Sequence, residues 1–572
     1  MSKITKLRHI FPRSIKIRLI ILIVGIIIGA QIETLTLSLI QPFIMILTEP
    51  SIIYTNRILS FAYSLFGFSG VTPFLAILAV IIAVVYVFRG LYIYFFARLQ
   101  NRFLATNTAI LSNSLLANTL TKPYLYHVNN DPSKLQALVI RKAERLYGVI
   151  ESSIQLLIDG FMTFFILIFL MISSFYMTLV VLLFATISTI VYFKIFKGKI
   201  QSSGDDELSG IVLINKAVLQ ALHGVKEIKI SQREQYFTNK FKEIRLQTVK
   251  IKERIQTMRQ LPRLFMESLC FSGAFLVVGL IIFAGVDVQL LLPQLGVFMI
   301  AAFKMFPAIS RILNSVTQVI RQSTSIDVVY SVLFESNDTQ LVPAPNAITS
   351  SRDIVVSGLT FRYPRTRKPV LANVSFKIPH NSSVGFIGAS GAGKSTLLDI
   401  MLGLLVPQVG SVVYDGKSVH HHFDSWAKNV GYVPQVIYLI DETIKENVAF
   451  GVDPKKIDEQ KVWQALEQAQ LKDFVASLPE QLEATVGDRG VRLSGGQRQR
   501  IGIARALYSN PSILVFDEAT ASLDNETEKA VMESIKSLRG KKTMLIVAHR
   551  LSTIEHCDIL FKVRKRTVRR VK

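Results

Sequence analysis

Six apolar runs, each about as long as a helix that crosses a lipid bilayer, constrain the fold of this chain of 572 residues more than any other feature. A bilayer-spanning helix needs about 20 predominantly apolar residues. Half of the residues are hydrophobic and only 19% are charged, which argues against a chain that is soluble throughout. The runs cover residues 19–47, 74–96, 154–172, 176–193, 264–283 and 290–313. We therefore predict an α-helical membrane domain with six transmembrane helices.

Two of the connections between these runs leave alternatives open. Only Ser173, Ser174 and Phe175 separate the third run from the fourth, which predicts a helical hairpin with a minimal turn, the alternative being one long span. The connection 51–70 has few charges and several apolar residues. It is either an amphipathic helix at the outer interface or an ordinary loop.

Basic residues in the connections predict the orientation of the helices. Six Lys or Arg residues precede residue 19, whereas the connection 48–73 carries only Arg57. Because cytoplasmic loops are enriched in Lys and Arg, the N-terminus is predicted to be cytoplasmic, and six spans return the C-terminus to the same side. The long basic segments 98–153 and 194–263 are then cytoplasmic, and we interpret their breaks near 122–131 and 221–225 as short contact helices.

The net charge of +24 is explained by a membrane surface better than by nucleic acid, because the basic loops alternate with apolar runs. We expect membrane lipids as partners and no nucleic acid. The two cysteines, Cys270 and Cys557, are too few for a disulfide framework. The C-terminal residues 562–572 include seven basic residues and are interpreted as a solvated or lipid-facing tail.

The composition changes sharply after Glu335. Residues 336–351 are polar and rich in Pro, Ser and Thr, which is typical of a linker. From residue 352, short Val/Ile-rich strands alternate with helical patterns, which predicts an α/β domain. The predicted organisation is a transmembrane domain over 1–335, a linker over 336–351 and a nucleotide-binding domain over 352–572.

The first chemical motif is a phosphate-binding loop. Residues 388–396 read GASGAGKST, between the apolar strand VGFI and the helical pattern TLLDIMLGLL. The glycines Gly388, Gly391 and Gly393 let backbone amides surround a phosphate, and the Lys394 ammonium reaches the β- and γ-oxygens. The Ser395 hydroxyl is a candidate Mg²⁺ ligand.

A second motif follows the apolar strand 513–516. Asp517 and Glu518 come directly after it. A charged group next to a buried strand is costly unless it is paired or binds a metal, so this acidic pair indicates a function. We assign the Asp517 carboxylate to the Mg²⁺ shell and the Glu518 carboxylate to orienting and deprotonating the attacking water.

Residues 493–497 read LSGGQ and lead into the helical pattern RIGIARAL. Together with the phosphate loop, the Asp-Glu strand and their order, this motif resembles the signature of the ATP-binding cassette (ABC) transporters. The resemblance extends over the whole chain and implies an exporter-type half-transporter, six spans followed by one α/β P-loop cassette. It implies an ATP hydrolase coupled to transport, with ATP and Mg²⁺ as cofactors.

The resemblance also implies roles for single residues. Tyr363 in FRYP resembles the aromatic residue that stacks on adenine, Gln435 in YVPQ resembles a glutamine that senses Mg²⁺, and His549 in IVAHR resembles a histidine that contacts the γ-phosphate. Residues 485–490 (TVGDRG) resemble the exporter-specific loop. The implied catalytic residues are Glu518, His549 and Gln435, and the implied Mg²⁺ ligands are Ser395, Gln435 and Asp517. The implied ATP-binding residues are Tyr363, Gly388, Ser390, Gly391, Gly393, Lys394, Ser395, Thr396, Ser494, Gly495, Gly496, Gln497 and Asp524.

In this family ATP lies between the P-loop of one cassette and the LSGGQ of another. A chain with one intact cassette therefore implies a partner, and a second copy of itself is the simplest one. The resemblance implies a cycle in which cassette closure opens the membrane dimer outward and hydrolysis resets it, with the breaks near 124–131 and 223–225 acting as coupling helices.

Charged residues in the predicted spans suggest a substrate site, because each is costly in a bilayer. Arg89, Arg263, Lys304 and Arg311 are predicted to line the inner half of the cavity as a positive belt suited to a pyrophosphate head group. The alternative is that Arg263 pairs with Glu267 and that Arg89 and Arg311 extend to the interface.

Several membrane segments, among them IETLTLSLIQPFI, VFRGLYIYFFARL and KMFPAISR, resemble bacterial flippases for lipid-linked oligosaccharides used in protein glycosylation. This implies a polyprenyl-pyrophosphate glycan as substrate, moved from the inner to the outer leaflet of a bacterial inner membrane. The alternatives are an exporter of lipids, drugs or peptides and an ATP-driven membrane regulator that transports nothing.

Overall fold

The computed structural model describes residues 2–48, 50–65, 68, 70–173, 175–283, 307–334, 352–364, 366–487, 490–518, 525–548 and 554–572. These residues form two compact units. The helical unit comprises Met1–Lys122 and Asn129–Ser336, and the α/β unit comprises Pro123–Val128 and Asn337–Lys572. The predicted linker 336–351 lies outside the described residues.

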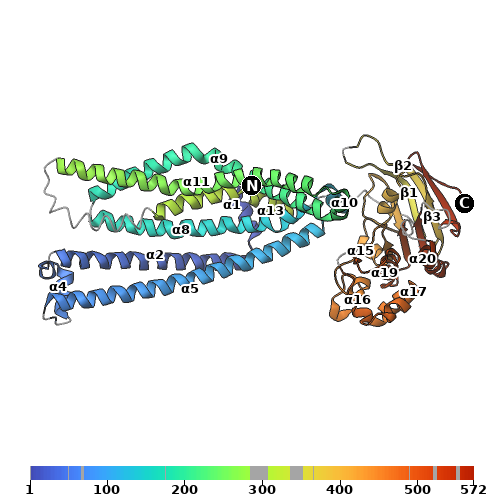
Figure 1. The fold of residues 1–572 in the computed structure, drawn as a ribbon, viewed down its shortest axis with the longest axis horizontal. Coiled ribbons are helices and arrows are strands. Elements are labelled where there is room, and N and C mark those ends of the chain that lie inside the picture. Colours follow the sequence, from blue (N-terminus) through green and yellow to red (C-terminus); the bar gives the residue numbers. More distant parts are fainter. Residues whose placement is uncertain are drawn as a thin grey trace. The chain divides into compact units, whose positions relative to one another are not determined.

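Long helices that run side by side dominate the helical unit (Figure 1). They are joined by short ones, and residues 307–322 are also helical. The helices are α1 (Lys3–Ile10), α2 (Arg13–Thr48), α3 (Ile52–Thr55), α4 (Arg57–Leu65), α5 (Val71–Leu120), α7 (Pro132–Val139), α8 (Arg141–Ser173), α9 (Phe175–His223), α10 (Val225–Ser231), α11 (Glu234–Phe283) and α13 (Thr324–Phe334).

Five of the six predicted spans lie within α2, α5, α8, α9 and α11. In the part of the chain that the structure describes, three helical stretches are long and apolar enough to cross a membrane, namely Arg13–Leu47, Val71–Leu120 and Pro132–Phe169. Most of the sixth predicted span, 290–313, lies outside the described residues. Helix α8 ends at Ser173, α9 begins at Phe175 and the two helices contact each other, so the predicted hairpin is confirmed.

The predicted breaks in the long basic segments are present. Helix α9 ends at His223 and α10 continues from Val225 after a bend of 67°. The bent stretch Asp206–His223 and Val225–Ser231 is also long and apolar enough to cross a membrane. The first break forms helix α6 (Tyr124–Asn129), and Pro123–Val128 group with the α/β unit. The connection 51–70 forms two short helices, α3 and α4, so the loop alternative was wrong.

A three-helix ion cluster holds the basic extensions of the helical unit together. The Glu207 carboxylate on α9 accepts hydrogen bonds from Arg145 on α8, at 2.9 Å, and from Arg321 in the helix 307–322. Both arginines are largely buried. Buried guanidinium groups need a paired anion, so this cluster fixes how the three helices cross.

Two sheets form the centre of the α/β unit. The four-stranded antiparallel sheet has the order β2-β1-β4-β5, and the six-stranded sheet has the order β10-β9-β3-β8-β7-β6. Strands β3, β6, β7, β8 and β9 are parallel, and β10 is antiparallel to β9. The strands are β1 (Ile354–Phe361), β2 (Leu371–Ile378), β3 (Ser383–Ile387), β4 (Val409–Tyr414), β5 (Lys417–Ser418), β6 (Val430–Val433), β7 (Ile513–Asp517), β8 (Thr543–Val547), β9 (Ile559–Arg564) and β10 (Thr567–Arg570).

The parallel strands are buried on both faces, because their side chains alternate between two apolar cores. On β7, Leu514 and Phe516 belong to the first core, whereas Ile513 and Val515 belong to the second. The helices of this unit are α14 (Lys394–Met401), α15 (Phe423–Ala427), α16 (Ile444–Val448), η1 (Pro454–Lys456), α17 (Glu459–Gln468), α18 (Lys472–Ser477), η2 (Gln481–Glu483), α19 (Gly495–Leu507) and α20 (Asn525–Ser537). Helix α19 packs in the first core and α14 in the second, so they cover opposite faces of the sheet.

The C-terminal residues correct one prediction. They form the β9–β10 hairpin at the edge of the six-stranded sheet and are not a solvated tail. The prediction was wrong because the charges conceal a strand pattern: Phe561 and Val563 are buried, while Lys562 and Arg564 between and after them are exposed.

Candidate functional site

Three of the predicted motifs follow strands at one edge of the six-stranded sheet. Strands β3, β8, β7 and β6 lie next to each other in that order and are parallel, so their carboxyl ends share an edge. The phosphate loop follows β3, Asp517 ends β7, Glu518 comes next, and Gln435 lies two residues after β6. The carboxyl edge of a parallel sheet is where α/β domains bind ligands.

The phosphate loop has the backbone that its glycines predict. Gly393, the N-terminal cap of α14, has φ 101°, which disfavours any side chain. A Cβ on Gly388 would lie 2.4 Å from the Val563 carbonyl oxygen of β9, so only glycine fits there. Ser390 and Gly391 are exposed at the tip of the loop, and Ser395 is exposed in the first turn of α14.

Lys394 is buried beneath this loop. Its Nζ donates hydrogen bonds to the carbonyl oxygens of Gly388, at 2.9 Å, and Ala389, at 3.2 Å. Burial and the neighbouring Glu518 carboxylate raise the pKa of Asp517, and the Lys394 ammonium opposes that rise. The structure thus brings the predicted lysine and the predicted metal-binding carboxylate together across β3, β8 and β7.

Glu518 and Gln435 are in direct contact. Gln435 Nε2 donates a hydrogen bond of 2.8 Å to Glu518 Oε2. The Glu518 backbone N–H donates to the Val547 carbonyl oxygen at the end of β8, and its φ is 50°. A non-glycine residue in the left-handed region is strained, and such strain is found mostly at functional sites. The sheet therefore holds Glu518 in a fixed position beside Gln435.

Tyr363 lies next to the phosphate-loop helix. Its hydroxyl is 3.2 Å from the Thr396 hydroxyl, and its ring meets Phe361 edge to face. The half-buried ring is thus held beside α14, as an aromatic platform for adenine requires.

The signature residues form the N-terminus of α19. Ser494 is the N-cap, and it makes a capping box with Gln497: the Ser494 N–H donates to Gln497 Oε1 at 2.8 Å, and the Gln497 N–H donates to Ser494 Oγ at 3.2 Å. Helix α19 begins at Gly495, five residues earlier than the pattern RIGIARAL. Gly495 is exposed and Gly496 is buried. An exposed helix N-terminus favours an anion such as phosphate.

A buried asparagine links the segment after Gln435 to α19. Asn447 on α16 accepts from the Ile440 N–H and donates to the Ile440 carbonyl oxygen, each at 3.0 Å. Arg505 on α19 donates to the Asn447 and Tyr438 carbonyl oxygens, both at 2.8 Å. Burial lowers the pKa of Arg505 to about 10. This connection was not predicted, because an asparagine within a helix belongs to no motif.

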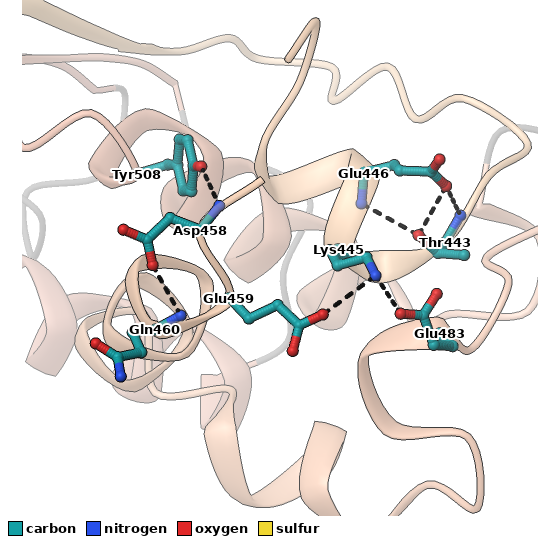
Figure 2. Close-up of polar contacts among 8 residues, drawn as sticks. All are labelled: Thr443, Lys445, Glu446, Asp458, Glu459, Gln460, Glu483 and Tyr508. Carbon is teal, nitrogen blue, oxygen red and sulfur yellow. Dashed lines mark hydrogen bonds and ion pairs between the residues drawn. The ribbon is translucent and has the colours of Figure 1, made fainter. Parts of the chain in front are cut away.

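Figure 2 shows the polar contacts that tie the surrounding helices together. Thr443 and Glu446 form a capping box at the start of α16, and Lys445 pairs with Glu459 of α17 and Glu483 of η2. The Asp458 N–H donates to the Tyr508 hydroxyl at 3.2 Å. These contacts connect α16, α17 and η2 to one another and to the C-terminal end of α19.

A further acidic residue, Asp399 on α14, was also missed. Burial raises its pKa to about 6, and the Asp517 carboxylate adds to the rise. Tyr124 of α6 and Tyr432 of β6 are close enough for the Asp399 carboxylate to raise the pKa of each. The sequence feature that could have identified Asp399 is its position as an acid within the largely apolar stretch TLLDIML.

Asp399→Asn is expected to stabilise the α/β unit at pH 7 and above. The folded-state pKa of this acid lies above its unfolded value near 4, so the folded state binds more protons and loses stability as the pH rises from about 4 to 6. The gain at pH 7 is expected to be about 1 kcal/mol after allowance for solvent screening. Fluorescence of Trp426 and Trp463, which both lie in this unit, measures its thermal unfolding. An equal gain at pH 4 and pH 8 would contradict the account.

Three predicted site residues, His549, Asp524 and Lys304, lie outside the described residues, as do Asp488 and Arg489 of the segment 485–490. Arg263 is exposed on α11.

The two remaining arginines of the predicted positive belt are paired with carboxylates. Arg89 on α5 pairs with the buried Glu33 on α2. Arg311 Nε donates at 2.8 Å to Asp159 on α8, whose other oxygen accepts from Gln155 at 2.7 Å. These carboxylates neutralise the charge at positions 89 and 311 of the predicted belt. Asp159 was not predicted, although an acid within an apolar run is as informative as a cation there.

A polar cavity of about 370 Å³ adjoins Arg311. Carboxamides and hydroxyls from α5, α8 and the helix 307–322 line most of it, together with Glu151 and Arg311. The cavity is lined by Gln100, Gly148, Glu151, Ser152, Gln155, Arg311, Asn314, Ser315, Gln318 and Gln322. Asn314 Oδ1 is buried and has no hydrogen-bond partner among the described residues.

The residues at the sheet edge fit a nucleotide polyphosphate. Backbone amides of the phosphate loop, the Lys394 ammonium and the Ser395 hydroxyl suit phosphate oxygens, and the carboxylate of Asp517 and hydroxyl of Ser395 are ligands that Mg²⁺ prefers. The positive φ of Gly393 and the close packing of Gly388 keep the loop open for such a group.

The fold and this site define a half-transporter in which a helical membrane domain precedes an α/β ATP-binding domain. Family comparisons agree: the model described as ABC transporter transmembrane region matches residues 19–299, and the model described as ABC transporter matches residues 371–521. The chain belongs to the ABC transporter family.

Individual relatives include a flippase and a multidrug transporter. An ATP-dependent lipid A-core flippase of Xanthomonas campestris pv. campestris is 31% identical over 390 residues, 67% of this chain and 65% of the relative. A multidrug resistance ABC transporter ATP-binding and permease protein of Lactococcus lactis subsp. lactis is 41% identical over 197 residues, 34% of this chain and 33% of the relative. The match thus spans just under two thirds of the flippase.

A solved structure has the same fold. The structure of a bacterial Atm1-family ABC exporter with ATP bound is similar with a TM-score of 0.79 at 20% identity, over 97% of this chain and 95% of that one.

Proposed function

We propose that this protein is an ATP-driven flippase that moves a lipid with a glycan head group, namely a lipid-linked oligosaccharide, from the inner to the outer leaflet of a bacterial inner membrane. The observation that carries the ATP-driven part is the Gln435–Glu518 contact at the sheet edge that also holds Lys394 and Asp517. We propose that both termini lie in the cytoplasm, as the basic connections predict.

Each residue at the sheet edge has a distinct task in this proposal. Lys394 leaves its loop carbonyl oxygens to bind the β- and γ-phosphate oxygens, and Glu518 accepts a proton from the attacking water. Gln435 fixes the Glu518 carboxylate through their hydrogen bond. Ser395, Gln435 and Asp517 would hold Mg²⁺, which neutralises phosphate charge when bound. His549 and Asp524 remain the proposed γ-phosphate contact and a proposed ATP-binding residue.

The proposed partner is a second copy of the chain. Helices α14 and α19 cover opposite faces of one sheet, so the phosphate loop and the signature of one cassette do not lie on the same face. A composite site between two copies supplies both motifs to each ATP. Helix α6 is proposed to couple the cassette to the membrane helices, since Leu125 packs against the second apolar core of the α/β unit.

A glycan head group is supported by the polar cavity. Its volume of about 370 Å³ lies in the usual range for small-molecule sites. Arg311 and Glu151 have opposite charges, and the remaining lining side chains are neutral, so the cavity suits hydroxyl groups more than a polyanion. A buried polar atom without a partner, such as Asn314 Oδ1, costs about 1–3 kcal/mol until a donor reaches it. Similarity to a lipid A-core flippase over two thirds of the chain supports a lipid cargo.

ATP hydrolysis in nanodiscs tests this cargo. The probes are a polyprenyl-pyrophosphate oligosaccharide, the same polyprenyl pyrophosphate without sugar, and phosphatidylcholine. We expect stimulation by the glycolipid alone. In Asn314→Leu and in Gln100→Leu, the glycolipid concentration for half-maximal stimulation is expected to rise about fivefold, since each substitution removes one hydrogen bond. Gln31→Leu, which changes an exposed carboxamide of α2 outside the cavity, is the control and is expected to behave as wild type.

Three other outcomes would contradict the proposal. Equal stimulation by the sugar-free pyrophosphate would indicate that a cationic belt recognises the pyrophosphate group. Stimulation by drugs or peptides alone would favour the broader exporter. Hydrolysis that responds to no added molecule would favour a membrane regulator.

A further inference from the structure

A second groove in the helical unit combines apolar walls with two arginines. It has a volume of about 390 Å³ and lies between α2 and α5, which pack against each other. Ile21 and Leu22 of α2 and Leu99 and Phe103 of α5 form its apolar part, and Arg18 and Arg102 complete it. Ile21 and Leu99 are 64% and 62% exposed, so the groove is open along its apolar wall.

The ends of the predicted spans place the groove at the membrane interface. Arg18 directly precedes the first predicted span, 19–47, and Arg102 lies six residues after the second, 74–96, about 9 Å along the helix. Because the two arginines line one groove, these two ends lie at the same face of the membrane. The basic connections place that face in the cytoplasm.

The two arginines give the groove its charge. Neither forms an ion pair with any of the residues that the structure describes, and both are exposed. The side chains described as lining the groove include no acid. This contrasts with Arg89 and Arg311, whose carboxylate partners neutralise them. A guanidinium pair beside an apolar wall matches a phosphate group attached to acyl chains.

We propose that this groove binds an anionic phospholipid of the cytoplasmic leaflet. The phosphate accepts hydrogen bonds from Arg18 and Arg102, and an acyl chain lies along Ile21 and Leu99. The bound lipid bridges α2 and α5 at the point where both helices leave the bilayer. The site is separate from the polar cavity proposed for the cargo, because the two share no lining residue.

Native mass spectrometry of the purified full-length protein tests this site. The protein is titrated with dioleoyl phosphatidylglycerol or with dioleoyl phosphatidylcholine, which have the same acyl chains. We expect one tightly bound phosphatidylglycerol per chain and no equivalent phosphatidylcholine. Arg18→Gln/Arg102→Gln is expected to weaken that binding about 25-fold, since each basic residue near a lipid surface contributes about fivefold.

Two further variants separate the groove from general surface charge. Arg13→Gln/Lys16→Gln removes the same charge from α2 without changing a lining residue, and its affinity is expected to stay within twofold of wild type. Leu99→Trp fills the apolar wall but keeps both arginines, and it is expected to lose the bound lipid. Basal ATP hydrolysis shows that each variant is folded.

The proposal is overturned by phosphatidylcholine binding as tightly as phosphatidylglycerol, or by full binding in Arg18→Gln/Arg102→Gln. An equal loss in Arg13→Gln/Lys16→Gln would overturn it too. None of these readouts requires transport, so the site stands or falls independently of the proposed flippase.

Discussion

Glu518→Gln is expected to lower the kcat of ATP hydrolysis by about 10²–10⁴-fold, the usual contribution of a general base. The substitution keeps the size of the side chain, and its carbonyl oxygen still accepts the 2.8 Å hydrogen bond from Gln435. It removes only the ability to accept a proton from water. ATP binding is therefore expected to persist, so that the variant retains bound ATP, as equilibrium binding and single-turnover assays measure.

The matched control is Glu533→Gln, which makes the same chemical change at an exposed position of α20. Its kcat is expected to equal that of wild type. Steady-state hydrolysis near the wild-type rate in Glu518→Gln would remove Glu518 as the base.

The second large effect is expected at the Asp159–Arg311 pair. Arg311→Leu leaves the Asp159 carboxylate, which is 1% exposed, with Gln155 as its remaining described hydrogen-bond partner. Breaking a buried pair in this way costs about 3–5 kcal/mol. Asp159→Asn is expected to cost less, because the Arg311 side chain is 47% exposed and water can solvate it. The fraction of monodisperse protein that remains after heating compares the variants.

Two comparisons make this prediction specific. The double variant Asp159→Asn/Arg311→Leu is expected to recover most of the loss, because it leaves no unpaired charge. Arg141→Leu breaks an exposed pair with Glu144 and is expected to change stability by less than about 1 kcal/mol. Equal losses in Arg311→Leu and Arg141→Leu would show that the buried pair has no special role.

This pair also changes how the cargo site is tested. Arg311→Glu places a second carboxylate beside Asp159, so a loss of transport in that variant would reflect repulsion as well as substrate contacts. Asn314 and Gln100 are better probes of the cargo site, because neither forms an ion pair that its substitution would break.

The cassette could be predicted from sequence in detail, because its chemistry follows strand ends. Asp517 comes directly after a run of buried residues, and the phosphate loop comes directly after another. Parallel strands then bring both to one edge. Two features of the cassette could not be predicted, because they depend on tertiary contacts that leave no local sequence pattern. Asn447 contacts Arg505 across 58 positions, and Asp399 acquires its raised pKa from burial.

The membrane domain was predictable in its helices and less so in its polar contacts. Apolar runs located the long helices, and a polar break located α6. The partners of Arg89 and Arg311 lie 56 and 152 positions away, and no periodicity in one helix reveals a residue on another. The C-terminal hairpin was misinterpreted because its basic residues outweighed the alternation of Phe561 and Val563.

The most direct test of the central proposal is flipping of a fluorescent polyprenyl-pyrophosphate oligosaccharide in liposomes that contain the purified protein. We predict transfer between leaflets that requires ATP and Mg²⁺, is absent in Glu518→Gln and does not extend to a fluorescent phosphatidylcholine. Transfer that continues without ATP, or hydrolysis that proceeds at full rate while the glycolipid stays in its original leaflet, would contradict the account.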